Sequence, residues 1–227
     1  MVVPDTSFYP SVDLALKYEK GFGHNKGLIN FLDYTIPLIP PGSHVLDAGC
    51  GTGKPVAISL AAAGHMVTGI DVSNAMVSLS RKAIPNGSFH VVDMRAFIPP
   101  PGIQFDAIFN ILSLFVLTRE EIEGLMEKWS AWMKPGGILG ICTIAAEDLD
   151  PESKGGKYDA DGLCARGVRE QFMSRISEYT LFTREGWSKM LADRGFVVKE
   201  TRMARHVPPP DADCGPEDHY FIVAQKI

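Results

Sequence analysis

The residues with the clearest chemical meaning form a short glycine-rich loop. The loop spans residues 47–53, has the sequence DAGCGTG and follows a short apolar run. Glycine at alternate positions lets the backbone approach a ligand closely, because no Cβ stands in the way. In open parallel sheets, a loop of this kind beyond the end of a strand holds the phosphate or sugar part of a nucleotide. The loop is therefore the centre of a candidate cofactor site.

The spacing of the glycines distinguishes three classes of ligand. A P-loop needs Ser or Thr after Gly-Lys, but Pro55 follows Gly53-Lys54, and Ala48 stands where the first glycine belongs. A dinucleotide fingerprint, Gly-x-Gly-x-x-Gly, needs a glycine where this chain has Lys54. The observed Gly-x-Gly-x-Gly pattern favours a nucleoside without a pyrophosphate. Binding of NAD or FAD is disfavoured but stays open, and with it an NAD-linked oxidoreductase.

Two acidic residues end the next two apolar segments. Asp71 ends residues 65–71 and Asp93 ends residues 87–93. A carboxylate at the first position can accept hydrogen bonds from two ribose hydroxyls at once. At the second position, Asp93 can accept from an adenine amine while the backbone N–H of Met94 donates to a ring nitrogen. Each acid alone also suits a turn or a helix cap, so it is their order on successive segments that predicts a nucleoside site.

The elements that must position these residues alternate along the chain. A helix that begins at Thr118, with Glu121 completing a capping box, ends before the turn at residues 134–137. Strands that alternate with helices predict an α/β fold, in which a parallel sheet is covered on both faces. The short Pro-rich loop 207–216 indicates that the last two strands form an antiparallel hairpin. The other predicted helices are 54–64, 73–84 and 183–191, and the strands are 43–49, 65–71, 87–93, 105–111, 138–144, 196–203 and 219–225.

Two stretches do not fit this alternation. Residues 1–41 precede the first strand, and residues 145–182 are too long for an ordinary connection. We expect a single domain over residues 1–227, with 1–41 as an N-terminal helical cap and 145–182 as an insert or lid over the acceptor pocket.

The composition is that of an ordinary globular protein. Of the 227 residues, 45% are hydrophobic and 22% are charged, and the net charge is −5. This balance excludes a disordered, collagen-like or coiled-coil chain, and it lacks the basic footprint of a nucleic-acid binder. The four cysteines have no metal-ligand spacing. No signal peptide or apolar segment long enough for a membrane span is visible. We therefore expect no metal, no nucleic acid, no membrane and a cytoplasmic location.

Several motifs together resemble the class I S-adenosylmethionine-dependent methyltransferases. VLDAGCGTG (45–53) is similar to their first motif and VTGIDVS (67–73) to their second, which ends in the ribose acid. FDAIFNI (105–111) is similar to their fourth-strand motif, and the turn at residues 134–137 to the one that precedes their fifth strand. Asp93 matches their adenine-side acid. The stretch GTGKPVA and residues 217–221 resemble the small domain-25 and domain-11 types, most of which act on small molecules.

The resemblance implies a fold, a cofactor and a set of contacts. The fold is a doubly wound, Rossmann-like seven-stranded sheet of order 3-2-1-4-5-7-6 with strand seven antiparallel. The cofactor is S-adenosylmethionine, and the product is S-adenosylhomocysteine. Asp47 would orient the methionine ammonium, Asp71 would hold the ribose, and Asn110 would lie beside the sulfonium. The full set of implied cofactor-binding residues is Tyr18, Asp47, Gly49, Gly51, Gly53, Asp71, Val72, Met76, Asp93, Met94 and Asn110.

Methyl transfer from a sulfonium is an in-line displacement, so holding donor and acceptor in line supplies most of the catalysis. A general base is needed only for a protonated, weakly nucleophilic acceptor, and the sequence contains no obvious catalytic dyad. His24 is the weak candidate for a base, with a surface role as the alternative, and Tyr18 either closes over the methionine carboxylate or simply packs. Asn110 is followed by apolar residues, which favours an apolar acceptor pocket. The candidate acceptor-binding residues are Tyr9, His24, Leu112, Tyr158 and Arg166.

The leading hypothesis is methyl transfer to an oxygen, nitrogen or sulfur nucleophile of a small organic molecule. The alternative is a protein of the same fold that binds the cofactor and catalyses a non-methylating reaction, as a cyclase or isomerase. Both hypotheses need the glycine loop and Asp71, so the sequence barely separates them. A monomer and a homodimer are equally compatible with the sequence.

Overall fold

A seven-stranded sheet forms the centre of the computed structural model, which describes residue 9 and residues 11–227. Its strand order is β3-β2-β1-β4-β5-β10-β9, and β10 runs antiparallel to both of its neighbours. The predicted order 3-2-1-4-5-7-6 is confirmed, since β9 and β10 are the sixth and seventh strands of this sheet along the chain. The strands are β1 (His44–Ala48), β2 (Met66–Asp71), β3 (Ser88–Val91), β4 (Phe105–Ile111), β5 (Met133–Thr143), β9 (Phe196–His206) and β10 (Glu217–Lys226).

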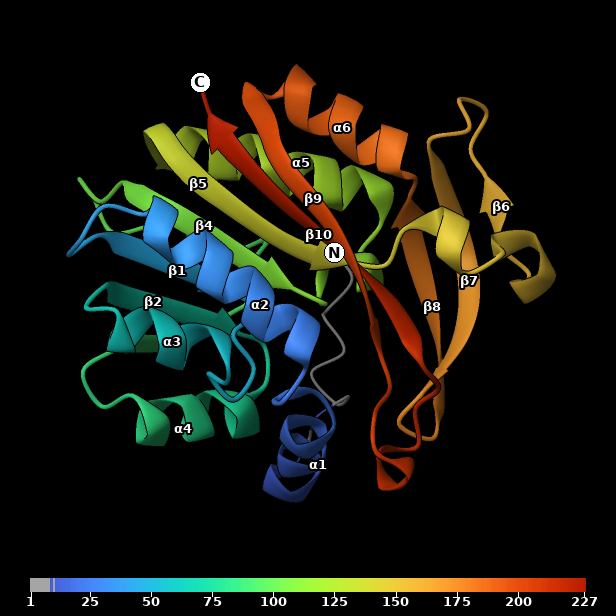
Figure 1. Cartoon of the computed structure of the whole chain (residues 1–227), viewed down its shortest axis with the longest axis horizontal. Coiled ribbons are helices and arrows are strands. Elements are labelled where there is room, and N and C mark those ends of the chain that lie inside the picture. Colours follow the sequence, from blue (N-terminus) through green and yellow to red (C-terminus); the bar gives the residue numbers. More distant parts are fainter. Residues whose placement is uncertain (1–8, 10) are drawn as a thin grey trace.

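Helices cover both faces of this sheet (Figure 1). Neighbouring residues of β1 pack into different cores: Val45 joins the core that contains α2 and α3, whereas Leu46 joins the one that contains α5 and α6. Strands that are buried on both faces read as continuous apolar runs, which is why the sequence revealed them. The helices are α1 (Val12–Phe22), α2 (Lys26–Thr35), α3 (Val56–Ala62), α4 (Asn74–Ala83), α5 (Arg119–Trp132) and α6 (Arg184–Asp193).

A second, three-stranded sheet occupies most of the stretch 145–182. Its order is β6-β7-β8, and both pairs of strands are antiparallel. Figure 1 shows this sheet and α1 beyond the end at which β4 and β5 terminate. The strands are β6 (Lys157–Tyr158), β7 (Cys164–Phe172) and β8 (Arg175–Phe182), and the short 3-10 helices of the chain are η1 (Ile36–Leu38), η2 (Leu114–Val116), η3 (Ala146–Asp148), η4 (Pro151–Lys154) and η5 (Pro210–Ala212).

The described part of residues 1–41 is helical. Ser11 caps α1 by accepting from the Leu14 N–H, and Asn25 caps α2 by accepting from the Leu28 N–H. α2 packs on the large sheet, while α1 lies at its end beside η5. Within the described residues, we find no helix whose length and hydropathy would allow it to cross a bilayer.

Candidate active site

The glycine loop connects β1 to α3 and folds back on the end of β2. The backbone N–H groups of Gly49 and Cys50 donate to the Ile70 carbonyl at 2.8 and 2.9 Å. Gly49 and Gly51 have φ of +82° and +53°, a region that favours glycine. A Cβ on Gly49 would lie 2.4 Å from the Ser113 Oγ, so no other residue fits there without movement. Backbone bonds and steric limits therefore fix the shape of the loop.

Asp71 holds this loop from the end of β2. Its Oδ2 accepts from the Gly51 N–H at 3.0 Å and its Oδ1 from the Ser73 N–H at 2.8 Å. Burial raises the pKa of Asp71, while these backbone hydrogen bonds act to lower it. Each carboxylate oxygen has further lone pairs, so both can still accept from hydroxyl groups. Asp71 therefore stands in the position that a vicinal diol needs.

Asp47 and Asn110 each present a buried acceptor atom that no described residue bonds. Asp47 is 1% exposed, and its Oδ2 has no hydrogen bond within the described part of the chain. Burial, with a smaller contribution from Asp71, raises the pKa of Asp47 to about 8. The Nδ2 of Asn110 donates to the Ala48 carbonyl at 2.7 Å and to the Ser113 Oγ at 2.8 Å, which leaves its buried Oδ1 free.

Unsatisfied buried polar atoms are rare in folded proteins. Asp47 and Asn110 come from the neighbouring strands β1 and β4, at the end where the glycine loop lies. Two acceptors, one of them ionisable, suit a ligand that carries N–H donors and positive charge. The residues present therefore fit the charged part of S-adenosylmethionine.

A pocket opens over the loop. A Cβ on Gly51 would lie 4.0 Å from the Met76 Sδ and 4.0 Å from the Tyr18 ring, which are ordinary van der Waals contacts. Leu112, with φ of +53°, turns the chain at the end of β4 and reaches the same pocket. The lining residues are Tyr18, Phe22, Asn25, Leu28, Asp47, Gly49, Cys50, Gly51, Lys54, Pro55, Val56, Ile111 and Leu112.

Asp93 makes a contact that the sequence analysis did not anticipate. Its carboxylate accepts from the Arg95 backbone N–H at 2.8 Å and from the Arg95 guanidinium at 2.6 Å. Arg95 also pairs with Glu121 of α5. Burial acts to raise the pKa of Asp93, but the hydrogen bonds from Arg95 outweigh it and hold the pKa below its ordinary value. An adenine amine would have to compete with this guanidinium.

Met94 and Met76 lie closer to the loop. The Sδ of Met94 is 3.9 Å from the Asn110 Nδ2, and Met76 is 1% exposed at the start of α4, one turn after Val72. Both thioethers can pack against a flat apolar ring. They suit the adenine part of the ligand better than the paired Asp93.

Aromatic rings close the pocket from the side of α1. Tyr18 stacks on Phe22 with 5.1 Å between ring centroids, and Tyr9 meets Tyr18 edge-on at 5.4 Å. Phe172, at the end of β7, lies 5.5 Å from Phe22. Burial is the main reason why the pKa of Tyr18 lies well above its ordinary value. α1 and the β7–β8 hairpin thus form one aromatic wall over the pocket.

Three of the candidate acceptor residues lie elsewhere. His24 is exposed in the turn between α1 and α2 and does not line the pocket. Tyr158 is 37% exposed on β6. Arg166 pairs with Asp159 at 2.7 Å and with Glu120 of α5 at 2.7 Å. Of the candidates, the structure brings Tyr9 and Leu112 to the site with the cofactor residues.

The structure reveals a further buried polar group at the start of β10. His219 is fully buried and bonded to Asn25 and Glu217, and its ring stacks on that of His206 at 5.6 Å. The alternation Glu217, His219, Phe221 along a strand was the available signal, because these side chains share one face. The hydrogen-bond partner of His219 is Asn25, the N-cap of α2, which is 194 positions away in the sequence.

The chain is similar to known methyltransferases. Residues 45–137 match a family described as a methyltransferase domain. The chain is 36% identical to trans-aconitate 2-methyltransferase of Paracidovorax citrulli over an alignment of 100 residues. This alignment covers 44% of this chain and 38% of that protein. An S-adenosyl-L-methionine-dependent Diels-Alderase of a Neonectria species is 29% identical over 83% of this chain and 70% of its own length. The chain thus spans just over a third of the first of these relatives.

Solved structures share the fold. A putative S-adenosylmethionine-dependent methyltransferase from Listeria monocytogenes has a TM-score of 0.67 at 17% identity and covers 88% of this chain and 99% of that one. The N-methyltransferase NodS from Bradyrhizobium japonicum has a TM-score of 0.66 at 15% identity, with 92% and 90% covered. In fold, motifs and matches, the chain is similar to the class I S-adenosylmethionine-dependent methyltransferases.

Proposed function

We propose that this protein binds S-adenosylmethionine and transfers its methyl group to a small organic molecule. The observation that carries the proposal is the pair of buried acceptor atoms of Asp47 and Asn110, which have no partner among the described residues and lie beside the glycine loop. Asp47 binds the methionine ammonium, Asp71 binds the ribose hydroxyls, and the Asn110 Oδ1 faces the positively charged sulfur. The cofactor supplies a methyl group on a good leaving group.

The chain's own residues supply orientation and exclude water. The aromatic wall of Tyr18, Phe22 and Phe172 covers the pocket, and an acceptor held against it lies in a dry, low-dielectric space. Positioning alone accounts for a large part of the rate of such a displacement. Methyl transfer is preferred to the non-methylating alternative because most of the relatives reported with this chain are named methyltransferases.

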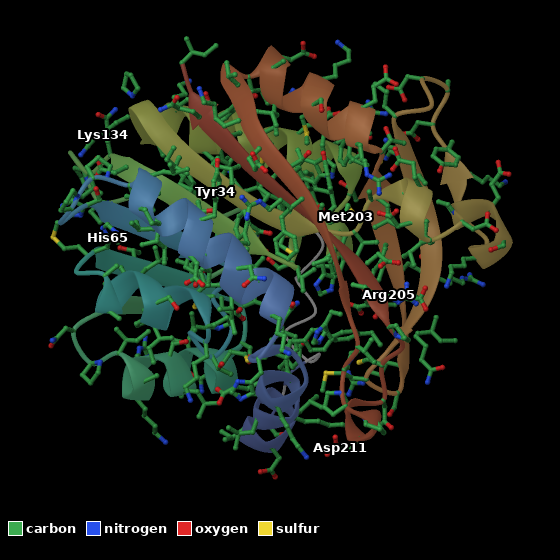
Figure 2. All side chains as sticks on the ribbon, viewed as in Figure 1. Tyr34, His65, Lys134, Met203, Arg205 and Asp211 are labelled. Atoms are coloured by element: carbon green, nitrogen blue, oxygen red, sulfur yellow. The ribbon has the colours of Figure 1, made fainter. Side chains whose placement is uncertain are left out.

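The test is a calorimetric titration with S-adenosylmethionine, followed by incubation with labelled cofactor and cell extract. We expect Asp71→Asn to weaken cofactor binding by about 2–3 kcal/mol, because a charged acceptor for two hydroxyls is lost. Asp106→Asn is the control, since Asp106 pairs with Lys134 at the opposite end of the sheet (Figure 2). Equal affinity of wild type and Asp71→Asn would refute the ribose contact. Turnover without S-adenosylhomocysteine would favour the non-methylating alternative.

A further inference from the structure

A carboxylate lies beside the aromatic wall, at the start of β10. Because β10 is antiparallel, its first residues lie at the end of the sheet where β4 and β5 terminate, and Tyr220 pairs with Thr143 there. Glu217 and His219 point to the face that α2 covers, as the contact between His219 and Asn25 shows. The cross-strand partner of Glu217 is His206 of β9.

Hydrogen bonds assign the proton on His219. The Oδ1 of Asn25 accepts from the Leu28 N–H at 3.2 Å, so its Nδ2 faces the His219 Nδ1 at 2.9 Å. The Nδ1 must then be an acceptor, which places the ring proton on Nε2. This N–H donates to the Glu217 Oε2 at 2.8 Å. Glu217 is thus oriented by a neutral imidazole. Asn25, at the other end of these hydrogen bonds, also lines the candidate cofactor pocket.

Among the described residues, no lysine or arginine lies within ion-pair distance of Glu217, although its side chain is only 12% exposed. His206 does not supply a positive charge either. Its Nε2–H donates to the Gly21 carbonyl at 2.9 Å, and burial lowers its pKa. The next residue, Asp218, is paired with Arg205 at 2.7 Å. Glu217 therefore remains a poorly hydrated carboxylate that lacks a cation.

The surroundings of Glu217 are aromatic. Burial is the main cause of the raised pKa of Tyr18 and of Tyr179, and the charge of Glu217 is the next contribution to both. Phe22 contacts the His206 ring at 5.1 Å and stacks on Tyr18. Aromatic faces attract cations, most strongly where water is excluded. One carboxylate within such a wall is complementary to an organic ammonium group.

We propose that Glu217 and the aromatic wall bind the cationic amine of the methyl acceptor, so that the substrate is an amine and the transfer is an N-methylation. This inference rests on the function proposed above. His219 is a positioning residue, because it holds the carboxylate through its Nε2–H and does not itself face the acceptor nitrogen.

Glu217 also receives the proton that must leave before transfer. The ammonium R–NH3+ gives one proton to the Glu217 carboxylate, which frees the nitrogen lone pair. That pair forms the N–C bond to the methyl group while the C–S bond breaks, and the bonding electrons of the C–S bond stay on sulfur. The products are R–NH2+–CH3, protonated Glu217 and the neutral thioether S-adenosylhomocysteine. Release of the proton from Glu217 to water completes the cycle.

The test compares two probes of nearly equal shape, benzylamine and benzyl alcohol. Each is titrated by calorimetry into the protein saturated with S-adenosylhomocysteine at pH 7. We expect benzylamine to bind about tenfold more tightly than benzyl alcohol, because it alone offers the cation. Glu217→Gln should reduce this preference to about twofold or less. Glu217→Asp, which keeps the charge, should retain most of it.

Asp218→Asn is the matched control, since it removes the same charge one residue away on the opposite face of β10. It should leave the preference for benzylamine unchanged. Equal affinity of the two probes for wild type, undetectable binding of benzylamine, or an equal loss in Asp218→Asn would overturn the proposal. So would a hydroxyl or thiol acceptor recovered from the labelled extract, and that outcome would leave the methyl transfer itself intact. Failure to bind S-adenosylmethionine would instead refute the proposed function.

Discussion

At the scale of single residues, the candidate cofactor site contains a carboxyl group that is difficult to ionise. Asp47 is 1% exposed, its Oδ2 has no hydrogen bond among the described residues, and its pKa is about 8 because of its burial and the nearby Asp71. At neutral pH, the group is therefore largely protonated. The unfolded chain returns it to an ordinary value of 3.8. Between these two pKa values, the folded state binds a proton that the unfolded state has lost.

The first prediction follows from this difference. The free energy of unfolding of the ligand-free protein should fall as pH rises from about 4 to about 8, because the unfolded state binds fewer protons over that range. Asp47→Asn removes the titrating group and should flatten this part of the profile. Urea denaturation at several pH values measures the free energy of unfolding of wild type and of Asp47→Asn. Parallel profiles for wild type and Asp47→Asn would contradict the assigned pKa.

The second prediction concerns ligand binding at the same residue. An ammonium group placed against Asp47 favours the ionised carboxylate, so S-adenosylmethionine should displace up to one proton near pH 7. Its affinity should then increase from pH 6 to pH 8. Calorimetry in phosphate and in Tris buffers, which differ in ionisation enthalpy, reports the released proton. Asp47→Asn should abolish the dependence on buffer, and a wild-type protein that shows none would exclude this role for Asp47.

At the scale of elements, the close approach of α2 to the last hairpin places Asn25 against His219. A Cβ on Gly27 would lie 2.5 Å from the Cβ of Ala204 on β9 and 3.4 Å from the ring of Phe221. A contact that short forces the helix away from the sheet. Gly27 is therefore the position in α2 at which the distance between the helix and the sheet is set.

The third prediction is that Gly27→Ala destabilises the fold. Overpacking costs about 1–3 kcal/mol, which outweighs the gain in helix propensity of about 1 kcal/mol. The matched control is Gly124→Ala in α5, where a new Cβ meets nothing within 4 Å. This second change should stabilise the protein by up to about 1 kcal/mol. Thermal and urea unfolding show whether each variant is more or less stable than wild type. A stabilised Gly27→Ala would show that α2 can shift freely.

A second set of contacts closes the aromatic wall. Asp213, in the loop between β9 and β10, binds Lys17 of α1 and accepts from the Ser174 Oγ at 3.0 Å at the tip of the β7–β8 hairpin. Its neighbour Asp211, in the same loop, pairs with Lys20 (Figure 2). Asp213 thus joins three segments that are distant in the sequence.

The fourth prediction is that Asp213→Asn loosens the hairpin tip. Exposed pairs of this kind stabilise only weakly, so amide exchange in residues 172–175 should accelerate about threefold to tenfold. Hydrogen exchange followed by mass spectrometry measures this rate. In the control Asp211→Asn, the tip should exchange as in wild type. Identical exchange in both variants would mean that packing alone closes the wall.

The sequence was informative where local chemistry determines structure. The glycine loop and Asp71 belong to short contiguous motifs, and the strands of the large sheet read as apolar runs. The pairing of Arg95 with Asp93 was not predicted, although the two residues are only two positions apart, because spacing does not reveal which partner a carboxylate takes. The link from Asn25 to His219 needs both the register of β10 and the cap of α2. β7 was not predicted because polar and apolar residues do not alternate regularly along it: Arg169, Glu170 and Gln171 are consecutive, and Gly167 interrupts the pattern.

At the scale of the whole molecule, the two sheets serve different parts of the site. The glycine loop, Asp47 and Asp71 belong to the large sheet, whereas Phe172 of the small sheet contributes to the aromatic wall. Ion pairs connect the small sheet to α5. Arg119 of α5 binds Asp159 at 2.8 Å and Asp161 at 2.7 Å with its side chain only 17% exposed. Cofactor binding and acceptor binding should therefore respond separately to changes at this junction.

The fifth prediction tests that separation with Arg119→Gln. Loss of a partly buried cation that holds two carboxylates should lower the free energy of unfolding by about 1–3 kcal/mol and speed amide exchange in residues 157–172. The affinity for S-adenosylmethionine should stay within about twofold, since none of the cofactor-binding residues proposed above lies on the small sheet. Arg169→Gln is the control on the same sheet: Arg169 pairs with Glu178, the two side chains are 68% and 62% exposed, and a loss of about 0.5 kcal/mol or less is expected. If Arg119→Gln weakened cofactor binding as much as it loosened the small sheet, the two halves of the site would be one cooperative unit.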